Sequence, residues 1–375
     1  MVSAGRDATL KVFLAGTSFS ITYGGPAYSV SRLANALAEA GVMVGLWAPD
    51  ASAPANAFLA SQSSVRRLAG SLVEAMEVFG HPDLIHDNGL WLKHNHDIAR
   101  LAARRAIPRL VSTRGMLEPW ALRHKRFRKR LALIAYQRRD LQNASMLHAT
   151  SEREASHLGD LELHPPICVI PNGVDIPPSI RENGADGGER VALFLGRIYP
   201  IKGLLMLIEA WSRVRPPGWR LHIAGPDEAG HLAELKAAVG HASLDDVVSF
   251  PGTVTGSPKA ALLRRADLFV LPSHSESFGM AVAEALASGL PVLTTTSVPW
   301  PQLPAAGAGW RVSPTVEGIT SGLRVATRID TQQLRAMGRK GRDLVGEAYR
   351  WPSIADNFID VYHRVKSQDF IPPRV

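Results

Sequence analysis

The stretch 268-LFVLPSHSESFGMAVAEALASGLPVLT-294 decides the fold of this chain. It opens with an unbroken apolar run, Leu268–Leu271, and passes through a polar loop to Gly279, where small and apolar residues predict a helix. A second apolar run begins at Pro291, after a Gly-Leu-Pro break. The order strand, loop, helix, strand is the unit of parallel sheets whose faces are covered by helices.

The same order recurs along most of the chain, where helical patterns such as Tyr28–Ala40 alternate with short apolar runs. Because 375 residues exceed what one hydrophobic core usually holds, two doubly wound α/β domains are the economical interpretation. We predict strands over Lys11–Ala15, Met43–Trp47, Asp83–His86, Arg109–Ser112 and Met146–Ala149 in the first half, and over Val191–Leu195, Arg220–Ala224, Leu268–Leu271 and Pro291–Thr294 in the second.

A segment dense in turn formers, Pro171–Gly188, separates the two halves. We therefore predict an N-terminal domain over residues 1–175 and a C-terminal domain over residues 176–350. Residues 351–375 follow, and the apolar spacing over Trp351–Val365 predicts a last helix that packs back on the N-terminal domain. Open α/β sheets bind ligands beyond the carboxyl ends of their strands, so function is expected in loops that follow strands, at a cleft that the two domains share.

The composition excludes several classes of protein. The chain has one cysteine, Cys168, so no internal disulfide can form, and a reducing compartment is expected. The N-terminus lacks the pattern of a secretory signal, and no window reaches the roughly 18 uncharged apolar residues that a membrane span needs. We expect a cytoplasmic protein, either free or peripheral at the inner face of the plasma membrane.

The net charge of +8 is concentrated in one stretch. No acidic residue lies between Pro119 and Arg139, and the basic residues there equal the whole excess: Arg123, Lys125, Arg126, Arg128, Lys129, Arg130, Arg138 and Arg139. A nucleic-acid-binding protein more often spreads its basic surface over a domain, with aromatic residues between the charges. Nucleic acid is therefore not an expected partner.

Residues 119–139 predict a basic helix. Pro119 suits a first helical turn, and an apolar stripe follows at a spacing of 3.6 residues: Trp120, Phe127, Leu131, Ile134 and Leu141. We expect the stripe to rest on the domain and the cations to face an anionic membrane surface, with about 1 kcal/mol gained for each basic residue near it. A packed helix whose cations are only solvated, or meet a soluble acceptor, remains the alternative.

The loop Ser273–Glu276 and the helix after it have the features of a ligand-binding turn. Free N–H groups at the start of a helix attract a phosphate or the oxygens of a sugar. If the whole span were helical, Glu276 and Glu284 would lie about 12 Å apart along the axis, whereas the two carboxylates of a glycoside hydrolase lie roughly 5–9.5 Å apart. This favours a transferase, with solvated helix charges as the alternative for both residues.

A second group of residues follows the predicted strand Val191–Leu195. Gly196 lets the chain turn, and Arg197 and Lys202 place two cations before a predicted helix, Leu204–Trp211. Fixed cations stabilise a diphosphate as its bond to a sugar breaks, without a metal. Cations at the start of a helix are unfavourable unless an anion is near, which argues against ordinary surface residues.

Taken together, these motifs resemble the GT-B retaining glycosyltransferases of family 4, from about Lys11 to the final helix. The motifs that carry the resemblance are Tyr23-Gly24-Gly25-Pro26, Pro171-Asn-Gly173-Val-Asp175, Gly196-Arg197 with Lys202-Gly203, Ile223-Ala-Gly225-Pro226, and Glu276 with Glu284. Within the family, bacterial enzymes of surface-polysaccharide assembly, including lipopolysaccharide and exopolysaccharide, are the most similar. That similarity rests on Ile85–Trp91, Ser112–Trp120, Leu147–Glu152 and Val298–Trp300.

The resemblance implies a site for a nucleotide-sugar donor. Arg197 and Lys202 would bind the donor diphosphate and form the catalytic group together with Glu276, which would hold the hydroxyls of the transferred hexose. Glu284 would hold the ribose. The other donor-binding residues that it implies are Gly24, Gly25, Gly196, Gly225, Phe278, Gly279 and Met280. The implied acceptor is a glycan, and if the basic helix meets a membrane, this glycan would be a lipid-linked pyrophosphate oligosaccharide on the cytoplasmic leaflet.

One position departs from the family. Several members carry a histidine in the loop after the fourth strand, whereas this chain has Arg114, which cannot accept a proton but could orient an anion or the acceptor. His86 is the nearest substitute, although a partly buried histidine is the more economical interpretation. Both are candidate acceptor-binding residues. In the front-face mechanism proposed for the family the departing phosphate takes the acceptor proton, so no strong protein base, metal or other cofactor is expected.

Three other functions fit parts of the sequence. A nicotinamide-dependent oxidoreductase needs Gly-x-Gly-x-x-Gly after a strand, and Gly307-Ala-Gly309 lacks the third glycine and follows no predicted strand. A basic module that binds nucleic acid or another anion would rest on Arg123–Arg139 alone. A sugar-nucleotide epimerase of the same GT-B shape remains open, because the pattern does not separate it from a transferase.

Overall fold

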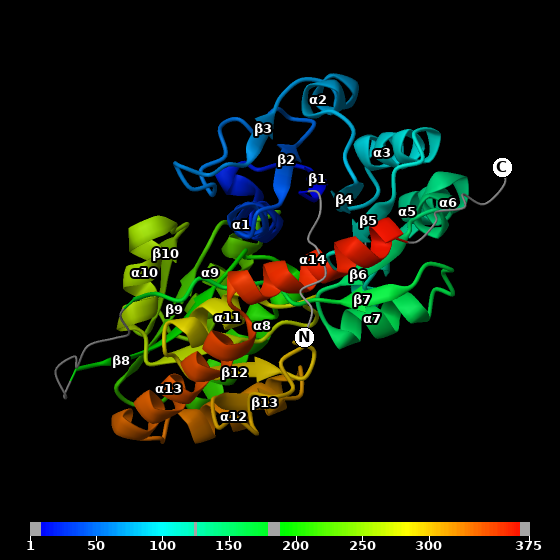
Figure 1. Cartoon of the computed structure of the whole chain (residues 1–375). Helices are drawn as coiled ribbons and strands as arrows, with labels where there is room; N and C mark the ends of the chain where they lie inside the picture. The colour runs from blue at the N-terminus through cyan, green and yellow to red at the C-terminus, as the bar shows by residue number, and fades with distance from the viewer. Residues whose placement is uncertain (1–8, 124–125, 179–187, 368–375) are drawn as a thin grey trace. The chain divides into compact units, whose positions relative to one another are not determined.

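The computed structural model of the chain describes residues 9–123, 126–178 and 188–367 (Figure 1). These residues form two compact units. Unit 1 lies within Met1–Gly173 and Trp351–Val375, and unit 2 is Val174–Arg350. The chain therefore leaves unit 1 once and returns to it, whereas residues 179–187 of the predicted linker lie outside the described part.

Unit 1 is built on a parallel sheet with the strand order β3-β2-β1-β4-β5-β6-β7. Its strands are β1 (Lys11–Ala15), β2 (Met43–Trp47), β3 (Arg66–Leu68), β4 (Leu84–Asn88), β5 (Arg109–Ser112), β6 (Met146–Ala149) and β7 (Ile167–Val169). Its main helices are α1 (Gly25–Glu39), α2 (Leu72–Phe79), α3 (Lys93–Arg104), α7 (Glu152–Gly159) and α14 (Trp351–Ser367).

Unit 2 repeats the scheme with the strand order β10-β9-β8-β11-β12-β13, again parallel throughout. Its strands are β8 (Arg190–Leu195), β9 (Trp219–Ala224), β10 (Val248–Gly252), β11 (Leu268–Leu271), β12 (Val292–Thr295) and β13 (Gly309–Val312). Its helices are α8 (Leu204–Val214), α9 (His231–His241), α10 (Gly256–Arg265), α11 (Met280–Ala287), α12 (Val316–Ala326) and α13 (Thr331–Ala348). Two doubly wound sheets are thus confirmed.

All the predicted strands are present, and their ends agree with the prediction or differ from it by at most two residues. The strands that the sequence did not predict are β3, β7, β10 and β13, and these are the four edges of the two sheets. Most side chains of these edge strands are exposed or only partly buried. In contrast, β11 and β12 are buried at every position. An edge strand lacks the unbroken apolar run that marks a strand covered on both faces.

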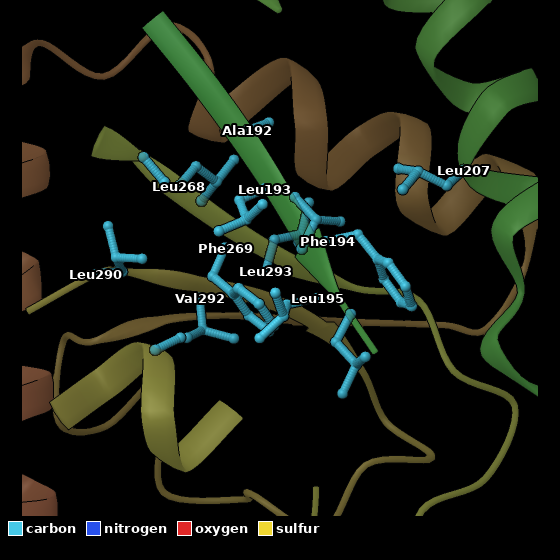
Figure 2. Packing of buried hydrophobic residues seen from close by; sticks show 14 of the residues in the cluster. Ala192, Leu193, Phe194, Leu195, Leu207, Leu268, Phe269, Leu290, Val292 and Leu293 are labelled. Carbon is cyan, nitrogen blue, oxygen red and sulfur yellow. The ribbon is translucent and has the colours of Figure 1, made fainter. Parts of the chain in front are cut away.

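The core of unit 2 shows why central strands are easy to predict. Ala192, Leu193 and Phe194 of β8 are successive residues that point to opposite faces of the sheet, and all three are fully buried. Figure 2 shows them beside Phe269 of β11 and Val292 of β12, which belong to the same cluster of buried side chains. Burying one such Leu or Phe side chain contributes roughly 1.5–3 kcal/mol, so polar residues are disfavoured at these positions.

The last helix belongs to unit 1, as the sequence predicted. α14, drawn in red in Figure 1, lies against α1 and β4. Ile354, Phe358, Val361 and Tyr362 recur at helical spacing and are buried in the same cluster as the apolar face of α1. The helix is therefore part of the core of unit 1 rather than an appendage.

The predicted basic helix is interrupted. It consists of α4 (Pro119–Arg123), α5 (Arg126–Ala132), a π-helical segment (Leu133–Gln137) and α6 (Arg138–Gln142), while residues 124–125 lie outside the described part. A π-helical segment changes the rotation between successive residues, so side chains before and after it no longer follow one 3.6-residue period.

The expectation that one apolar stripe rests on the domain is wrong for most of its length. Phe127, Leu131 and Ile134 are 71%, 69% and 76% exposed, whereas Leu141, beyond the π-helical segment, is buried. Gln137 and Asp140 are buried near it. The apolar residues of α5 therefore face away from unit 1, on the same part of the chain as the arginines.

A chain of buried polar side chains joins α14 to the sheet of unit 1. Tyr362 Oη lies 2.7 Å from His86 Nδ1, His86 Nε2 lies 2.6 Å from Ser112 Oγ, and Ser112 Oγ lies 2.6 Å from His148 Nδ1. At its end, His148 Nε2 lies 2.8 Å from the carbonyl oxygen of Ile170. A carbonyl only accepts, so His148 must donate from Nε2. Every other donor then follows: Ser112 donates to His148, His86 to Ser112, and Tyr362 to His86.

Burial keeps both His86 and His148 neutral. It lowers the pKa of His148 to about 3 and holds the pKa of His86 well below its usual value, with the neighbouring His148 acting in the same direction. In the unfolded chain a histidine protonates near pH 6.5. Between these values the unfolded state binds more protons than the folded state, so stability is present above pH 6.5 and is lost as the pH falls.

We expect the free energy of unfolding of unit 1 to fall by up to about 2.7 kcal/mol per pH unit below pH 6.5 from these two histidines. His148→Gln should remove about half of that slope between pH 6 and 5, as measured by urea unfolding at each pH. His363→Gln, at an exposed position of α14, is the control and should keep the wild-type slope. An unchanged slope in His148→Gln would contradict the assignment.

Candidate active site

The candidate site of unit 2 lies where the strand order of its sheet reverses. From β8 the chain builds outward to β9 and β10 on one side, and then to β11, β12 and β13 on the other. The loops after β8 and β11 therefore leave neighbouring strands at the same edge, where open α/β sheets bind ligands. A backbone hydrogen bond of 2.8 Å from His274 N to Ile201 O ties the two loops together.

Lys202 and Glu276 form the central ion pair of this site. Lys202 Nζ lies 2.5 Å from Glu276 Oε1, and Ser273 Oγ donates to the same oxygen at 2.7 Å. Only 14% of the Lys202 side chain and 13% of the Glu276 side chain are exposed. A charge that is removed from water loses its solvation, and the opposite charge of the ion pair must compensate for that loss. A second anion near Lys202 would therefore compete directly with Glu276.

Arg197, the other predicted cation, lies in a more open place. Its NH1 atom is 2.7 Å from Glu228 Oε2, and the two side chains are 55% and 44% exposed. A parallel bridge between Ile198 and Asp227 brings the loop after β9 to the loop after β8. Exposed ion pairs contribute about 0–1 kcal/mol, so Arg197 can exchange Glu228 for another anion at little loss.

The carboxylate of Glu284 is also paired with a cation. Glu284 Oε1, on α11, lies 2.6 Å from Lys259 Nζ, on α10, and the side chains are 16% and 29% exposed. Sequence reasoning missed Lys259. The residue lies in the first turn of α10, and a cation at a helix start was the signal that singled out Lys202. The same argument would have found it.

Aromatic side chains hold the backbone that precedes α11. Gly279 is the N-cap of α11, with φ +84° and no side chain to cap the helix. The indole of Trp300 donates from Nε1 to the carbonyl oxygen of Phe278 at 2.7 Å, and the rings of Phe278, Trp300 and Tyr349 pack with centroids 5.0–5.9 Å apart. The amides at Gly279 and Met280 therefore start the helix from a rigid loop, and Trp300 is a supporting residue whose packing role the sequence did not reveal.

Glu276 lies in this loop and not on the helix. α11 begins at Met280, so the estimate of a helical separation between Glu276 and Glu284 does not apply. Each carboxylate has its own cation, Lys202 for Glu276 and Lys259 for Glu284. Two separately paired carboxylates suit two contacts along an extended ligand.

Gly196 and Gly225 let the ends of β8 and β9 approach closely. A Cβ added to Gly225 would lie 1.8 Å from the carbonyl oxygen of Gly196. No side chain fits there unless the backbone moves, so this contact fixes the start of the loop that carries Arg197.

In unit 1 the structure brings Arg114 to the helix that starts at Gly25, whose N-cap is Gly24. Arg114 donates from NH1 to Ser29 Oγ of α1 at 3.1 Å. His86, in contrast, is fully buried, and both of its ring nitrogens are hydrogen-bonded. This geometry favours the interpretation of His86 as a buried histidine that supports α14, and Arg114 as the acceptor-side candidate.

Metal-binding clusters and the cysteine are the other groups that could carry chemistry. No cluster of three or more His, Cys, Asp or Glu side chains in residues 9–123, 126–178 and 188–367 is arranged to hold a metal ion. Burial raises the pKa of Cys168 to about 12, so its thiol is inert near neutral pH. Cys168 is a small, partly buried core residue.

Two doubly wound units, one of them with cations and an uncapped helix start at its reversal point, define an α/β enzyme of the GT-B type. The glycosyl transferases group 1 family matches residues 175–341, and the glycosyl transferase 4-like domain matches residues 24–173. The chain belongs to the group 1 glycosyltransferases and transfers a sugar from a nucleotide sugar.

Individual relatives differ in substrate. The chain is 26% identical over 293 residues to a GDP-mannose:cellobiosyl-diphosphopolyprenol alpha-mannosyltransferase from Xanthomonas campestris, and the match covers 75% of this chain and 74% of that protein. Among solved structures it is similar in fold to sucrose-phosphate synthase from Thermosynechococcus elongatus, with a TM-score of 0.78, 20% identity, and coverage of 95% and 99% of the two chains. It is also similar to Anabaena HepE in complex with UDP and glucose, with a TM-score of 0.73, 19% identity, and coverage of 95% and 100%.

Gly225→Ala should destabilise unit 2, because its methyl group would overlap the carbonyl of Gly196. We expect a loss of about 3 kcal/mol or more in the free energy of unfolding. The matched control is Gly240→Ala, in the last turn of α9 with nothing within 4 Å of the new Cβ, which should be neutral or stabilise by up to about 0.5–1 kcal/mol. Equal effects of the two variants in urea unfolding would contradict the close contact.

Proposed function

We propose that the chain transfers a hexose, with retention and without a metal, from a nucleotide-diphosphate sugar to a lipid-linked glycan in the assembly of a bacterial surface polysaccharide. The observation that carries the proposal is the ion pair of Lys202 and Glu276 at the reversal point of unit 2, beside the uncapped start of α11. The group holds a cation for a diphosphate, a carboxylate for sugar hydroxyls, and backbone amides for anionic oxygens.

In this proposal the donor replaces the internal carboxylate partners. The diphosphate takes the Nζ of Lys202 and the guanidinium of Arg197, which releases Glu276 and Glu228. Glu276 then accepts hydrogen bonds from the hydroxyls of the transferred hexose, while Ser273 continues to orient it. After the exchange both cations are paired with the diphosphate, Glu276 accepts hydrogen bonds from hydroxyls, and Glu228, 44% exposed, is solvated by water, so no bare charge is left in the buried part of the site.

The transfer step follows the front-face route that the family resemblance implies. The bond between the anomeric carbon and the phosphate oxygen breaks, and a bond from the acceptor hydroxyl oxygen to the same carbon forms on the same face. The acceptor proton passes to the departing phosphate oxygen. Lys202, Arg197 and the amides at the start of α11 stabilise the charge that develops on the diphosphate.

Glu284 and Lys259 bind the nucleoside end of the donor. Glu284 accepts hydrogen bonds from the ribose hydroxyls, and Lys259 holds one carboxylate oxygen at 2.6 Å so that the other stays available. The similar proteins use different nucleotides, GDP-mannose in one name and UDP with glucose in another. A binding screen therefore covers UDP, GDP, ADP and CMP with their common sugars.

We expect one of these nucleotides to raise the melting temperature of the wild-type chain. Glu284→Ala should weaken its binding by about 10–100-fold, equal to roughly 1.4–2.7 kcal/mol. Glu276→Gln should keep most of the binding and lower turnover by about 100–1,000-fold. Glu209→Gln, which changes an exposed carboxylate of α8, is the control for charge alone.

If Glu284→Ala binds the nucleotide like the wild type, the ribose contact is misassigned. If the chain converts a donor to another nucleotide sugar in the absence of an acceptor, it is an epimerase.

We also propose that residues 126–137 dock on the anionic face of a membrane, where a lipid-linked acceptor would lie. Phe127, Leu131 and Ile134 expose apolar side chains among arginines that have no acidic neighbour between 119 and 139. Apolar side chains outward with flanking cations are the arrangement of a helix lying in a bilayer interface. In the described residues no helix has the length and apolar character of a membrane span, so the contact would be peripheral.

The variant Phe127→Ser/Leu131→Ser/Ile134→Ser should bind vesicles containing phosphatidylglycerol at least about tenfold more weakly. The reason is that three apolar side chains inserted into the bilayer together contribute well over about 1.4 kcal/mol. Co-sedimentation at fixed lipid measures it. Its melting temperature should be unchanged, since all three side chains are exposed. Val78→Ser, a 72% exposed apolar position on α2, is the control. A wild-type chain with no preference for anionic over zwitterionic vesicles would remove the proposal.

A further inference from the structure

Arg114 is held in an unusual backbone conformation by a buried carboxylate. Its φ is +47°, in the left-handed region that non-glycine residues rarely occupy. Glu154 Oε1 accepts from Thr113 Oγ1 at 2.6 Å and from the backbone N of Gly115 at 2.5 Å, on either side of Arg114. Its Oε2 accepts from the N and Oγ1 of Thr150, both at 2.7 Å. Four hydrogen bonds to one carboxylate keep a strained residue in place, as is common at functional sites.

The guanidinium of Arg114 is surrounded by neutral oxygen acceptors. Nε and NH2 donate to Asn88 Oδ1 at 3.0 and 2.7 Å, and NH1 donates to Ser29 Oγ and Asn172 Oδ1, each at 3.1 Å. Asn88 is itself oriented, since its Nδ2 donates to the carbonyls of Ala15 and His86. The side chain is therefore aimed by amides and a hydroxyl, which fix its direction without cancelling its charge.

In the described part of the chain Arg114 has no carboxylate within ion-pair distance. The charge of Glu154 acts on Arg114, but the oxygens of this carboxylate are engaged by Thr113, Gly115 and Thr150. Burial lowers the pKa of Arg114 to about 10, so the guanidinium still carries its charge at neutral pH. Part of the residue remains exposed. A partly buried cation that lacks an ion pair attracts an anion from solution.

The start of α1 adds positive potential at the same place. α1 is a helix of 15 residues whose N-cap, Gly24, offers no side chain to its first N–H groups. Ser29, which accepts from Arg114, lies in the second turn of this helix. Helix starts and arginines both favour anionic oxygens, and the contact with Ser29 places the guanidinium about one turn from the start of α1.

We infer that Arg114 and the start of α1 form a binding site of unit 1 for an anionic oxygen group, a phosphate or diphosphate, of a substrate. Glu154 and Asn88 are its positioning residues. The assignment to a substrate rests on the proposed function, whereas the anion site itself does not. The anion would come from the diphosphate of a lipid-linked acceptor, or from the diphosphate of the donor.

Asn88→Asp tests the inference with almost no change in shape. The new carboxylate would lie where Asn88 Oδ1 now accepts two hydrogen bonds from Arg114, and it would neutralise the guanidinium internally. Because Asn88 also donates to two carbonyls, Asn172→Asp serves as a second variant that touches Arg114 through NH1 alone. Gln62→Glu makes the same change of charge at an exposed position of unit 1 and is the control.

The measurement is calorimetric titration of inorganic pyrophosphate into the full chain, with the nucleoside diphosphate found in the screen present at saturation. We expect the wild type and Gln62→Glu to bind pyrophosphate, and Asn88→Asp and Asn172→Asp to bind it at least tenfold more weakly. This result assigns the site to an anion other than that of the donor. If the two Asp variants instead weaken the nucleoside diphosphate itself by that factor, the donor supplies the anion.

Unchanged affinity for both ligands in both Asp variants, with folding confirmed by melting temperature, would overturn the inference. It would make Arg114 a structural residue that braces α1. Failure of the proposed function gives a different result, because then no nucleoside diphosphate binds the wild-type chain. Pyrophosphate titrated alone would in that case still report on Arg114.

Discussion

The ion pair of Lys202 with Glu276 is the interaction on which the site of unit 2 depends. It joins the loop after β8 to the loop after β11, and Ser273 and the backbone bond from His274 to Ile201 keep both loops in register. Because both side chains are largely buried, the site is stable only while each charge has a partner. Ligand binding at such a place is an exchange of partners, and an anion that cannot offer hydroxyl groups to Glu276 would leave that carboxylate unpaired. In the proposed function the pair would therefore select for a ligand that carries both negative charge and hydroxyls.

Most of the fold could be predicted from the sequence because its sheets are parallel. Strands such as β8 and β11 are covered on both faces, and the apolar runs that result stand out from helical patterns. The four edge strands could not be predicted in this way, since half of their surroundings is solvent or loop. The prediction of one basic helix with a single apolar stripe failed for a different reason: a π-helical segment, Leu133–Gln137, interrupts the helix, and the periodicity of the sequence does not report such a change of helix type.

The candidate site divides along the same line. Residue type and position after a strand were enough to single out Arg197, Lys202, Glu276 and Glu284. Their partners were not predictable, because Glu228 and Lys259 lie 31 and 25 residues away in sequence and meet them only through the sheet. Arg114 illustrates both sides: its departure from the family pattern was visible in the sequence, but the neutral character of its neighbours depends on Ser29, Asn88 and Asn172, which come from three separate segments.

The double passage of the chain between the units sets an order for synthesis on the ribosome. Unit 2 is one continuous segment, Val174–Arg350, and needs no later residues to complete it, whereas unit 1 needs α14, which follows unit 2 in the sequence. At roughly 5–20 residues per second, some 10–35 s separate the emergence of Gly173 from that of Trp351. During that interval the apolar face of α1 is uncovered and His86 lacks its tyrosine partner. The nascent protein therefore carries an exposed apolar face until α14 has been synthesised, and this is the stage at which chaperones would recognise it.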